Sequence, residues 1–201
     1  MKQLQSGRVL ATCGMCIALA AVTSFIKVFS LPMGGSVTLL SMFFITIIGY
    51  MYGLKVSIPA AIAYGLVQFI LKPEMYTPVQ VIVDYFCAFG ALGLSGAVCM
   101  KNNTNLREMP TDSFEDSHTT HKDFTCLILG YLIGVTGRFV FATISGVIFW
   151  GEYAWDGWNP VLYSICYNGM YIYAEAIVTI AILFIPAVRS AIVRVTSSLK
   201  M

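Results

Sequence analysis

The chain has 201 residues, of which 58% are hydrophobic and 11% are charged, and its mean hydropathy is +0.78. Soluble domains carry about 25% charged residues and about 45–50% apolar ones, so the composition excludes an ordinary soluble domain and indicates a membrane protein. The net charge of +2 says little by itself, because the distribution of charges along the chain matters more than their sum.

Charge-poor stretches follow one another from the start of the chain to its end. A membrane-spanning helix needs about 20 mainly apolar residues, so these stretches predict an all-α, polytopic membrane protein with one bundle of six helices over residues 1–201. The apolar run of the first stretch is long for a signal peptide and further membrane helices follow it directly, so we expect it to remain in the protein. The expected helices cover residues 8–29, 36–53, 56–72, 78–100, 123–150 and 161–188.

The basic residues predict which side of the membrane each loop occupies. With six spans, both termini lie on the same side, and that side collects Lys2, Arg8, Lys55, Lys101, Arg107, Lys122, Arg189, Arg194 and Lys200. The opposite side has only Lys27 and Lys72. The positive-inside rule therefore predicts cytoplasmic termini and a cytoplasmic loop at about residues 101–122, between the fourth and fifth helices.

The familiar catalytic and nucleotide-binding motifs are missing from the sequence. There is no G-x-x-x-x-G-K-[ST] pattern for ATP and no dinucleotide glycine pattern. Cys13 and Cys16 have a redox spacing, but they lie in an apolar helix, where small core residues are the simpler interpretation. His118 and His121 lie in the polar loop, where we expect solvated side chains. The sequence thus predicts a protein that is not an enzyme and has no cofactor and no metal site.

The fifth expected helix carries a stripe of four residues, each spaced by four, that climbs towards the outer edge. The stripe begins at Arg138, passes the small residues Ala142 and Gly146, and ends at Trp150. Residues spaced by four lie on one helix face. Small residues beneath a tryptophan leave room for a ligand, but tight packing between helices also favours small residues. This stripe alone leaves both interpretations open.

The fourth and sixth helices add polar groups at matching depths. Counting about 1.5 Å per residue from the outer helix ends, Asp84 lies about 9 Å deep and Asn168 about 10 Å deep, and Gln80 shares a face with Asp84. Arg138 and Glu175 lie deeper, at about 18 and 21 Å. Isolated intramembrane charges are costly, so we hypothesise that these two form an ion pair. The outer layer is then expected to contain an anion but no cation.

The stretch at residues 145–169, which joins the fifth and sixth expected helices, holds all three tryptophans of the chain. An interfacial aromatic belt would explain part of this enrichment. A site for a flat, cationic molecule would explain more, because aromatic faces attract cations and an amide can both donate and accept hydrogen bonds. We therefore predict that this stretch, with its three tryptophans, supplies the lid and one wall of an extracellular binding pocket.

Two motifs resemble a known family. The pattern G-x-x-F-W…Y-A-W-x-G-W…Y-S…N-G, with a basic residue two turns before its first glycine, and the segment VDYFCAFGALGLSG at 83–96 are similar to the thiamine-specific S component of energy-coupling factor (ECF) transporters. Residues 34–54 resemble that family's second helix and the preceding loop. The resemblance implies ligand contacts at Asp84, Tyr85, Arg138, Gly146, Trp150, Tyr163 and Asn168.

The resemblance also implies partners. Proteins of this family bind one vitamin outside the cell and deliver it together with a transmembrane coupling subunit and two ATPases, which agrees with the missing nucleotide motif. Small residues of the first helix, such as Gly14 and Ala18, would face the coupling subunit, although packing inside the bundle explains them equally well. The chain departs from the family where Asp84 replaces a Glu, Ala142 a His and Gly35 a Trp of some relatives.

Three other functions remain open from the sequence. The ligand of the same class of protein could be another vitamin or a thiamine precursor. A self-sufficient, proton-coupled vitamin transporter would use Asp84, Arg138 and Glu175 as its titrating groups. A structural membrane protein would use its aromatic residues only as an interfacial belt.

Overall fold

The computed structural model describes residues 2–31, 35–75, 77–98, 117–155 and 157–200. Five helical stretches among these residues are long and apolar enough to cross a membrane, and a shorter apolar helix, α2 (Ser41–Tyr52), accompanies them. The mainly helical fold agrees with the prediction. The five stretches are α1 (Lys2–Ser24), α3 (Leu54–Leu71), the segment Pro78–Val98, α7 (Ser117–Phe149) and α8 (Pro160–Leu183).

A short hairpin separates α1 from α2, where the sequence predicted helix almost without interruption. Strand β1 (Lys27–Ser30) pairs antiparallel with β2 (Ser36–Thr38), so the expected helices 8–29 and 36–53 are wrong at their facing ends. A charge-free stretch indicates burial in an apolar medium but does not distinguish strand from helix. The β-branched pair Val37 and Thr38 favours an extended backbone.

The fourth transmembrane stretch is an irregular helix. It begins with α4 (Pro78–Val81), whose first turn is capped by the Thr77 side chain. It continues as the π-helix η2 (Ile82–Cys87), α5 (Ala88–Gly90) and the 3₁₀ helix η3 (Ala91–Ser95). A π-helical turn changes the direction in which its side chains point and is frequent at functional sites. Two predicted site residues, Asp84 and Tyr85, lie on η2.

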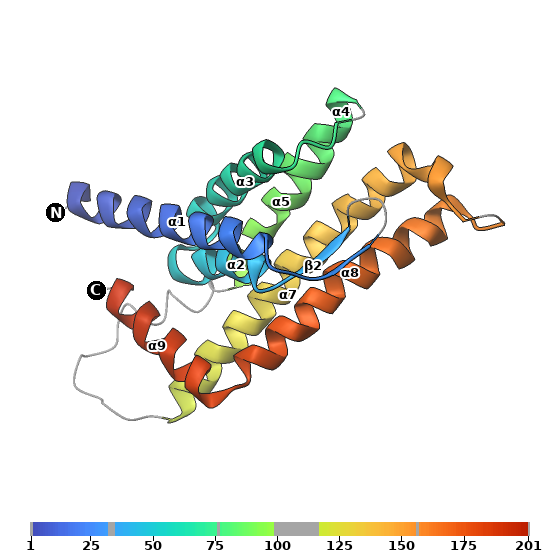
Figure 1. Ribbon diagram of the computed structural model, residues 1–201. Coiled ribbons are helices and arrows are strands. Elements are labelled where there is room, and N and C mark those ends of the chain that lie inside the picture. The colour runs from blue at the N-terminus through green and yellow to red at the C-terminus, as the bar shows by residue number, and fades with distance from the viewer. Residues whose placement is uncertain (1, 32–34, 76, 99–116, 156, 201) are drawn as a thin grey trace.

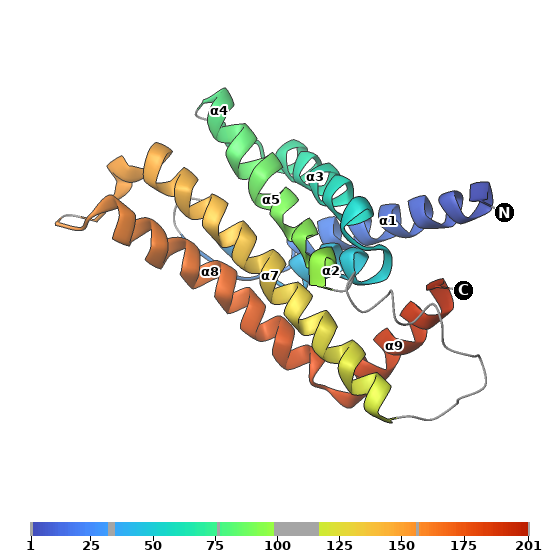
Figure 2. The ribbon, with the colours of Figure 1, turned by 180° about the vertical axis from the view of Figure 1, so that it is seen from behind.

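Helices α7 and α8 run antiparallel and side by side, as both ribbon views show (Figures 1 and 2). Glycines of α7 allow the fourth stretch to approach closely on another face. A Cβ atom at Gly130 would lie 2.8 Å from the Ser95 carbonyl oxygen, and one at Gly134 would lie 2.8 Å from that of Leu92. Small residues at such crossings let backbones pack against each other without side chains between them.

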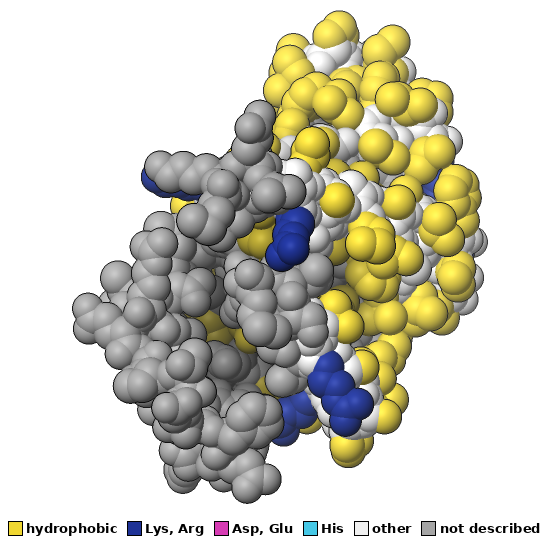
Figure 3. Space-filling model, turned by 90° about the vertical axis from the view of Figure 1, so that its left-hand side faces the viewer, with side chains coloured by type: hydrophobic (Ala, Val, Ile, Leu, Met, Phe, Trp, Pro, Cys, Tyr) yellow, Lys and Arg dark blue, Asp and Glu magenta, His cyan; other side chains and the backbone are white. Residues whose placement is uncertain are grey.

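The molecule has a buried apolar centre and an apolar outer surface. Ile45, Leu92, Tyr131 and Ile172 come from four different elements and are almost fully buried in one hydrophobic cluster. Many large apolar side chains on the outer faces of the helices are exposed, and Figure 3 shows how widely hydrophobic surface extends over one side. Apolar residues on both sides of a helix are expected when lipid surrounds the bundle.

The two chain ends lie at one end of the molecule, and the turn that joins α7 to α8 lies at the other (Figure 1). This turn contains the short 3₁₀ helix η4 (Gly151–Tyr153). The predicted last helix, 161–188, is too long, because α8 ends at Leu183 and Pro186 starts a separate helix, α9 (Pro186–Lys200). Proline cannot continue a helix from its interior but is well suited to the first turn of a new one.

Candidate functional site

A cavity of ≈ 200 Å³ lies between the fourth stretch, α7 and α8, in the half of the molecule away from the chain ends. Residues at the end of α3 and at the start of β2 complete its wall. All seven site residues that the sequence predicts line this one cavity: Asp84, Tyr85, Arg138, Gly146, Trp150, Tyr163 and Asn168. The structure thus brings together residues that lie more than 80 positions apart in the chain.

Asp84 places a carboxylate in the cavity wall. Its Oδ2 atom accepts a hydrogen bond of 2.6 Å from the side-chain amide of Gln80, one turn earlier. The same amide nitrogen lies 3.4 Å from the Glu74 carbonyl oxygen in the loop between α3 and α4. Gln80 is almost fully buried, so its amide holds the carboxylate in one orientation. Because Gln80 is neutral, this hydrogen bond does not cancel the negative charge of Asp84.

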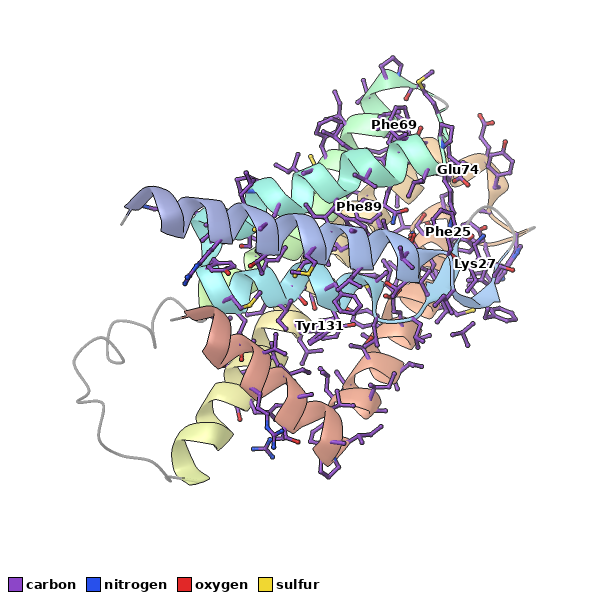
Figure 4. All side chains as sticks on the ribbon, turned by 60° about the vertical axis from the view of Figure 1, so that its left-hand side comes forward. Phe25, Lys27, Phe69, Glu74, Phe89 and Tyr131 are labelled. Atoms are coloured by element: carbon purple, nitrogen blue, oxygen red, sulfur yellow. The ribbon has the colours of Figure 1, made fainter. Side chains whose placement is uncertain are left out.

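Tyr85 joins the cavity wall to the loop after α3. Its hydroxyl donates to the Lys72 carbonyl oxygen at 2.8 Å and accepts from the backbone N–H of Glu74 at 3.2 Å. Its ring stacks against Phe89 with 6.2 Å between centroids and meets the edge of Phe69 at 5.0 Å. Figure 4 labels both phenylalanines on neighbouring elements. Tyr85 therefore fixes the loop that borders the cavity, in addition to lining the cavity itself.

Arg138 lies on the Phe89 ring, with its guanidinium carbon 4.4 Å from the ring centroid. A guanidinium at this distance over an aromatic face gains a favourable cation–π interaction. The hypothesised ion pair with Glu175 is wrong: no salt bridge joins these two side chains in the described part of the chain. Equal depth in two helices does not bring side chains together when they point to different neighbours. Arg138 remains available at the cavity wall.

Glu175 is buried and satisfied by the junction between β2 and α2. Its Oε1 atom accepts from the Ser41 hydroxyl at 2.8 Å and from the Met42 backbone N–H at 3.1 Å, and its Oε2 atom accepts from the Thr38 hydroxyl at 2.6 Å. A helix N-terminus has free N–H groups and a partial positive charge. Glu175 of α8 thus caps α2 and fixes the strand that lines the cavity.

Gly146 and Asn168 bring α7 and α8 into contact at the cavity wall. A Cβ atom at Gly146 would lie 2.8 Å from the Ser164 hydroxyl oxygen and 3.1 Å from the Asn168 amide nitrogen. The Asn168 amide donates to the Ser164 carbonyl oxygen at 2.9 Å, and its oxygen accepts from the Tyr171 hydroxyl at 2.8 Å. An amide has two donors and two acceptor sites, so Asn168 keeps one of each.

The sequence analysis predicted that all three tryptophans belong to the lid or wall of the pocket, but in the structure they have different positions. Trp150 lines the cavity and contacts the Tyr153 ring, with 5.7 Å between centroids. Trp155 and Trp158 are outside the cavity lining and are 52% and 41% exposed. They pack against each other at 5.1 Å. Their position fits an interfacial belt, so only Trp150 is a wall residue.

A ladder of tyrosines on α8 forms the wall opposite the fourth stretch. Tyr163 stacks on Tyr167 with 5.7 Å between centroids, and Tyr167 meets the edge of Tyr171 at 5.8 Å. The Tyr167 hydroxyl accepts a hydrogen bond of 3.0 Å from the backbone N–H of Gly35. A Cβ atom at Gly35 would lie 2.7 Å from that hydroxyl oxygen. The glycine therefore permits the β-hairpin to close directly onto the ladder.

The mouth of the cavity contains a cation that the sequence analysis did not place there. Lys72 and Glu74 both line the cavity, and the Lys72 ammonium lies 5.8 Å from the centroid of the Phe25 ring. Burial lowers the pKa of Lys72, and the neighbouring Lys27 lowers it further. Figure 4 shows Phe25, Lys27 and Glu74 together at this end of the molecule. The outer layer is thus not purely anionic.

Several lining residues were missed by the sequence analysis. Phe89, Ser164 and Tyr167 each lie one helical turn from a predicted site residue, so the spacing of four that revealed the stripe of α7 could have found them. Lys72 and Glu74 lie in a loop, which has no such periodicity. The additional lining residues are Gly35, Ser36, Gln68, Lys72, Glu74, Gln80, Ala88, Phe89, Ala142, Ser145, Tyr153, Ser164, Tyr167 and Tyr171.

The fold and the cavity together define a class of protein. Apolar helices long enough to cross a membrane surround a cavity whose wall combines aromatic rings, a carboxylate, a guanidinium and an amide. A concave cavity that combines aromatic side chains with a few fixed polar groups is the usual form of a small-molecule site. The protein is therefore a helical membrane protein with a cavity of the kind that holds a small solute.

Comparison with known proteins identifies the family. The chain belongs to the thiamine transporter protein family (Thia_YuaJ), whose model matches residues 10–194, and it is accordingly a multi-pass protein of the cell membrane. It is 30% identical over 164 residues to the thiamine transporter ThiT of Bacillus subtilis, covering 80% of each chain. It is 27% identical over 142 residues to ThiT of Lacticaseibacillus paracasei, covering 69% of this chain and 66% of that one.

The fold is also that of a solved structure. The structure of ThiT from Listeria monocytogenes matches 94% of this chain and 99% of its own, with a TM-score of 0.74 and 27% sequence identity. The likeness therefore extends over nearly the whole bundle rather than over the motif region alone. The family that the motifs of residues 83–96 and 146–169 indicated is confirmed.

Proposed function

We propose that the protein is the substrate-binding S component of an ECF-type importer. It binds thiamine in the cavity from outside the cell, and a separate transmembrane coupling subunit and two ATPases drive its uptake. Membership of the thiamine transporter family supports the choice of thiamine. The observation that carries the proposal is the convergence of all seven predicted contact residues on one cavity.

Thiamine consists of an aminopyrimidine ring and a cationic thiazolium ring with a hydroxyethyl group. In the proposed complex, Asp84 supplies the negative charge that attracts the thiazolium, and Trp150 and Tyr163 supply aromatic faces. Asn168 uses its remaining donor and acceptor at the pyrimidine edge. Tyr85 and Arg138 line the floor and side of the cavity, and Gly146 provides the space that any side chain would fill.

The proposed membrane topology has six spans in a single domain over residues 1–201, with both termini and the loop at about residues 101–122 in the cytoplasm. The short helix α2 is the sixth span. Two features support this topology. Both chain ends lie opposite the α7–α8 turn (Figure 1). The face at the chain ends carries Lys and Arg, and no acidic residue is coloured there among the described side chains (Figure 3).

In this proposal, the energy for uptake comes from subunits other than this chain. The sequence has no phosphate-binding loop, so ATP hydrolysis requires other subunits. A proton-coupled transporter would use the acidic residues Asp84 and Glu175, but Glu175 accepts hydrogen bonds from three donors and lies outside the cavity lining. This engagement favours a binding subunit over a self-sufficient transporter.

The test is uptake of labelled thiamine into proteoliposomes. One set contains this protein alone with an imposed proton gradient, and a second contains it with an ECF coupling subunit and two ATPases, loaded with ATP. We expect accumulation only in the second set, and none when the P-loop lysines of the ATPases are substituted. Accumulation by the protein alone would favour a proton-coupled transporter. If the protein does not bind thiamine but binds another vitamin or a thiamine precursor, that compound would replace thiamine as the proposed ligand.

A further inference from the structure

Two serine hydroxyls in the cavity wall have no hydrogen-bond partner in the described part of the chain. Ser145 of α7 and Ser164 of α8 are each 1% exposed, and both line the cavity. A hydroxyl carries one donor and two acceptor sites. Buried polar groups in folded proteins are nearly always paired, so an unpaired hydroxyl at a cavity indicates a partner that arrives with a ligand or with water.

The two serines lie beside Gly146, where α7 packs against α8 at the cavity. Ser145 directly precedes Gly146, and the Ser164 hydroxyl oxygen would lie 2.8 Å from a Cβ atom at that glycine. Asn168 lies beside them with one donor and one acceptor unused. These groups form a neutral polar strip, and at one end of it the Ser145 hydroxyl lies beside the Asp84 carboxylate without a hydrogen bond of good geometry. The strip matches a flat ring whose edge has an N–H donor next to a nitrogen acceptor.

Burial without a partner does not by itself identify a ligand contact. Tyr131, Thr143 and Thr179 also have buried hydroxyl oxygens without a partner among the described residues. None of the three lines the cavity. The position on the cavity wall is therefore what distinguishes the two serines, and Thr179, on the same helix as Ser164, provides a matched control.

We propose that Ser145 and Ser164 are specificity-determining residues, whose hydroxyls bind the amino group and ring nitrogen at the aminopyrimidine edge of the ligand. This inference rests on the proposed function, because it takes thiamine as the ligand. A site that hydrogen-bonds a polar edge rejects an analogue with the wrong donors, since its own polar groups are then left unpaired. Oxythiamine, in which an oxo group replaces the amino group, is such an analogue.

The experiment measures affinity and unliganded stability for the same variants. The purified proteins are wild type, Ser145→Ala, Ser164→Ala and Thr179→Val, titrated with thiamine and with oxythiamine by calorimetry. We expect the serine variants to bind thiamine about 3- to 10-fold more weakly, the size of one neutral hydrogen bond. Their preference for thiamine over oxythiamine should shrink. Their unliganded Tm should stay equal or rise, because an unpaired buried hydroxyl is removed.

The opposite directions of affinity and stability separate recognition from packing. A purely structural serine would lower Tm and affinity together, and that result would overturn the inference. Thiamine binding within twofold of wild type in both serine variants would also overturn it while leaving the proposed function intact. Thr179→Val should bind thiamine like wild type. If wild type itself binds no thiamine, the proposed function fails, and this inference fails with it.

Discussion

The substitution Asp84→Asn removes the negative charge of the cavity wall with little change of shape. The carboxylate accepts a hydrogen bond of 2.6 Å from Gln80, and an amide oxygen can accept the same bond. At an effective dielectric constant of about 20, opposite charges about 5 Å apart attract by about 3 kcal/mol. Water at the mouth and the nearby Arg138 reduce this value, so we expect a loss of about 1–3 kcal/mol, or about 5- to 150-fold in Kd.

Isothermal titration with thiamine measures this loss, and the unliganded Tm shows whether the fold is intact. A neutral analogue, in which a thiophene replaces the thiazolium ring, provides the matched control. The substitution should reduce the binding free energy of thiamine by the full amount and that of the neutral analogue by almost nothing, because only thiamine carries the positive charge. Equal losses for both ligands, or a thiamine Kd within twofold of wild type, would refute an electrostatic role of Asp84.

Three further predictions concern other parts of the site. A double-mutant cycle of Arg138→Met and Glu175→Gln, followed by thermal unfolding, should give a coupling energy near zero, since the two side chains bind different partners; a coupling above about 1 kcal/mol would restore the ion pair. Tyr85→Phe keeps the ring but removes the hydroxyl that holds the α3–α4 loop, so thiamine should dissociate about 3- to 10-fold faster in a stopped-flow experiment. An unchanged dissociation rate would show that this loop does not contribute to thiamine binding. Gly146→Ala, whose Cβ atom would lie 2.8 Å from a serine oxygen, should weaken binding at least about 10-fold, whereas Gly7→Ala, with nothing within 4 Å, should bind normally.

The sequence predicts the long helices because apolar length alone determines them. α3, α7 and α8 lie close to their expected ranges, and their ends shift by only a few residues apart from the start of α7 and the end of α8. The hairpin β1–β2 escaped prediction because a strand and a helix can be equally apolar. The π-helix η2 was not predicted, because the apolar pattern of this stretch indicates a helix but not its type.

The candidate site is predicted where its residues repeat along one helix or match a family motif. The stripe from Arg138 to Trp150 follows from a spacing of four, and all seven residues that the family resemblance implied as contacts line the cavity. The partner of Glu175 was not predictable, because its three donors come from residues 38–42, more than 130 positions away. Depth along a helix gives a level in the membrane, whereas rotation about the helix and the approach of neighbours decide the contact.

The central claim is that thiamine enters the cavity whose wall includes Trp150. The most direct measurement is a fluorescence titration of the purified protein with thiamine, made on wild type, Trp150→Phe and Trp158→Phe. Trp150 lines the cavity, whereas Trp158 is 41% exposed outside it. We expect saturable quenching in wild type and in Trp158→Phe, and its near-complete loss in Trp150→Phe, which should still bind thiamine by calorimetry. Quenching that survives in Trp150→Phe but disappears in Trp158→Phe, or the absence of saturable binding to wild type, would contradict this account.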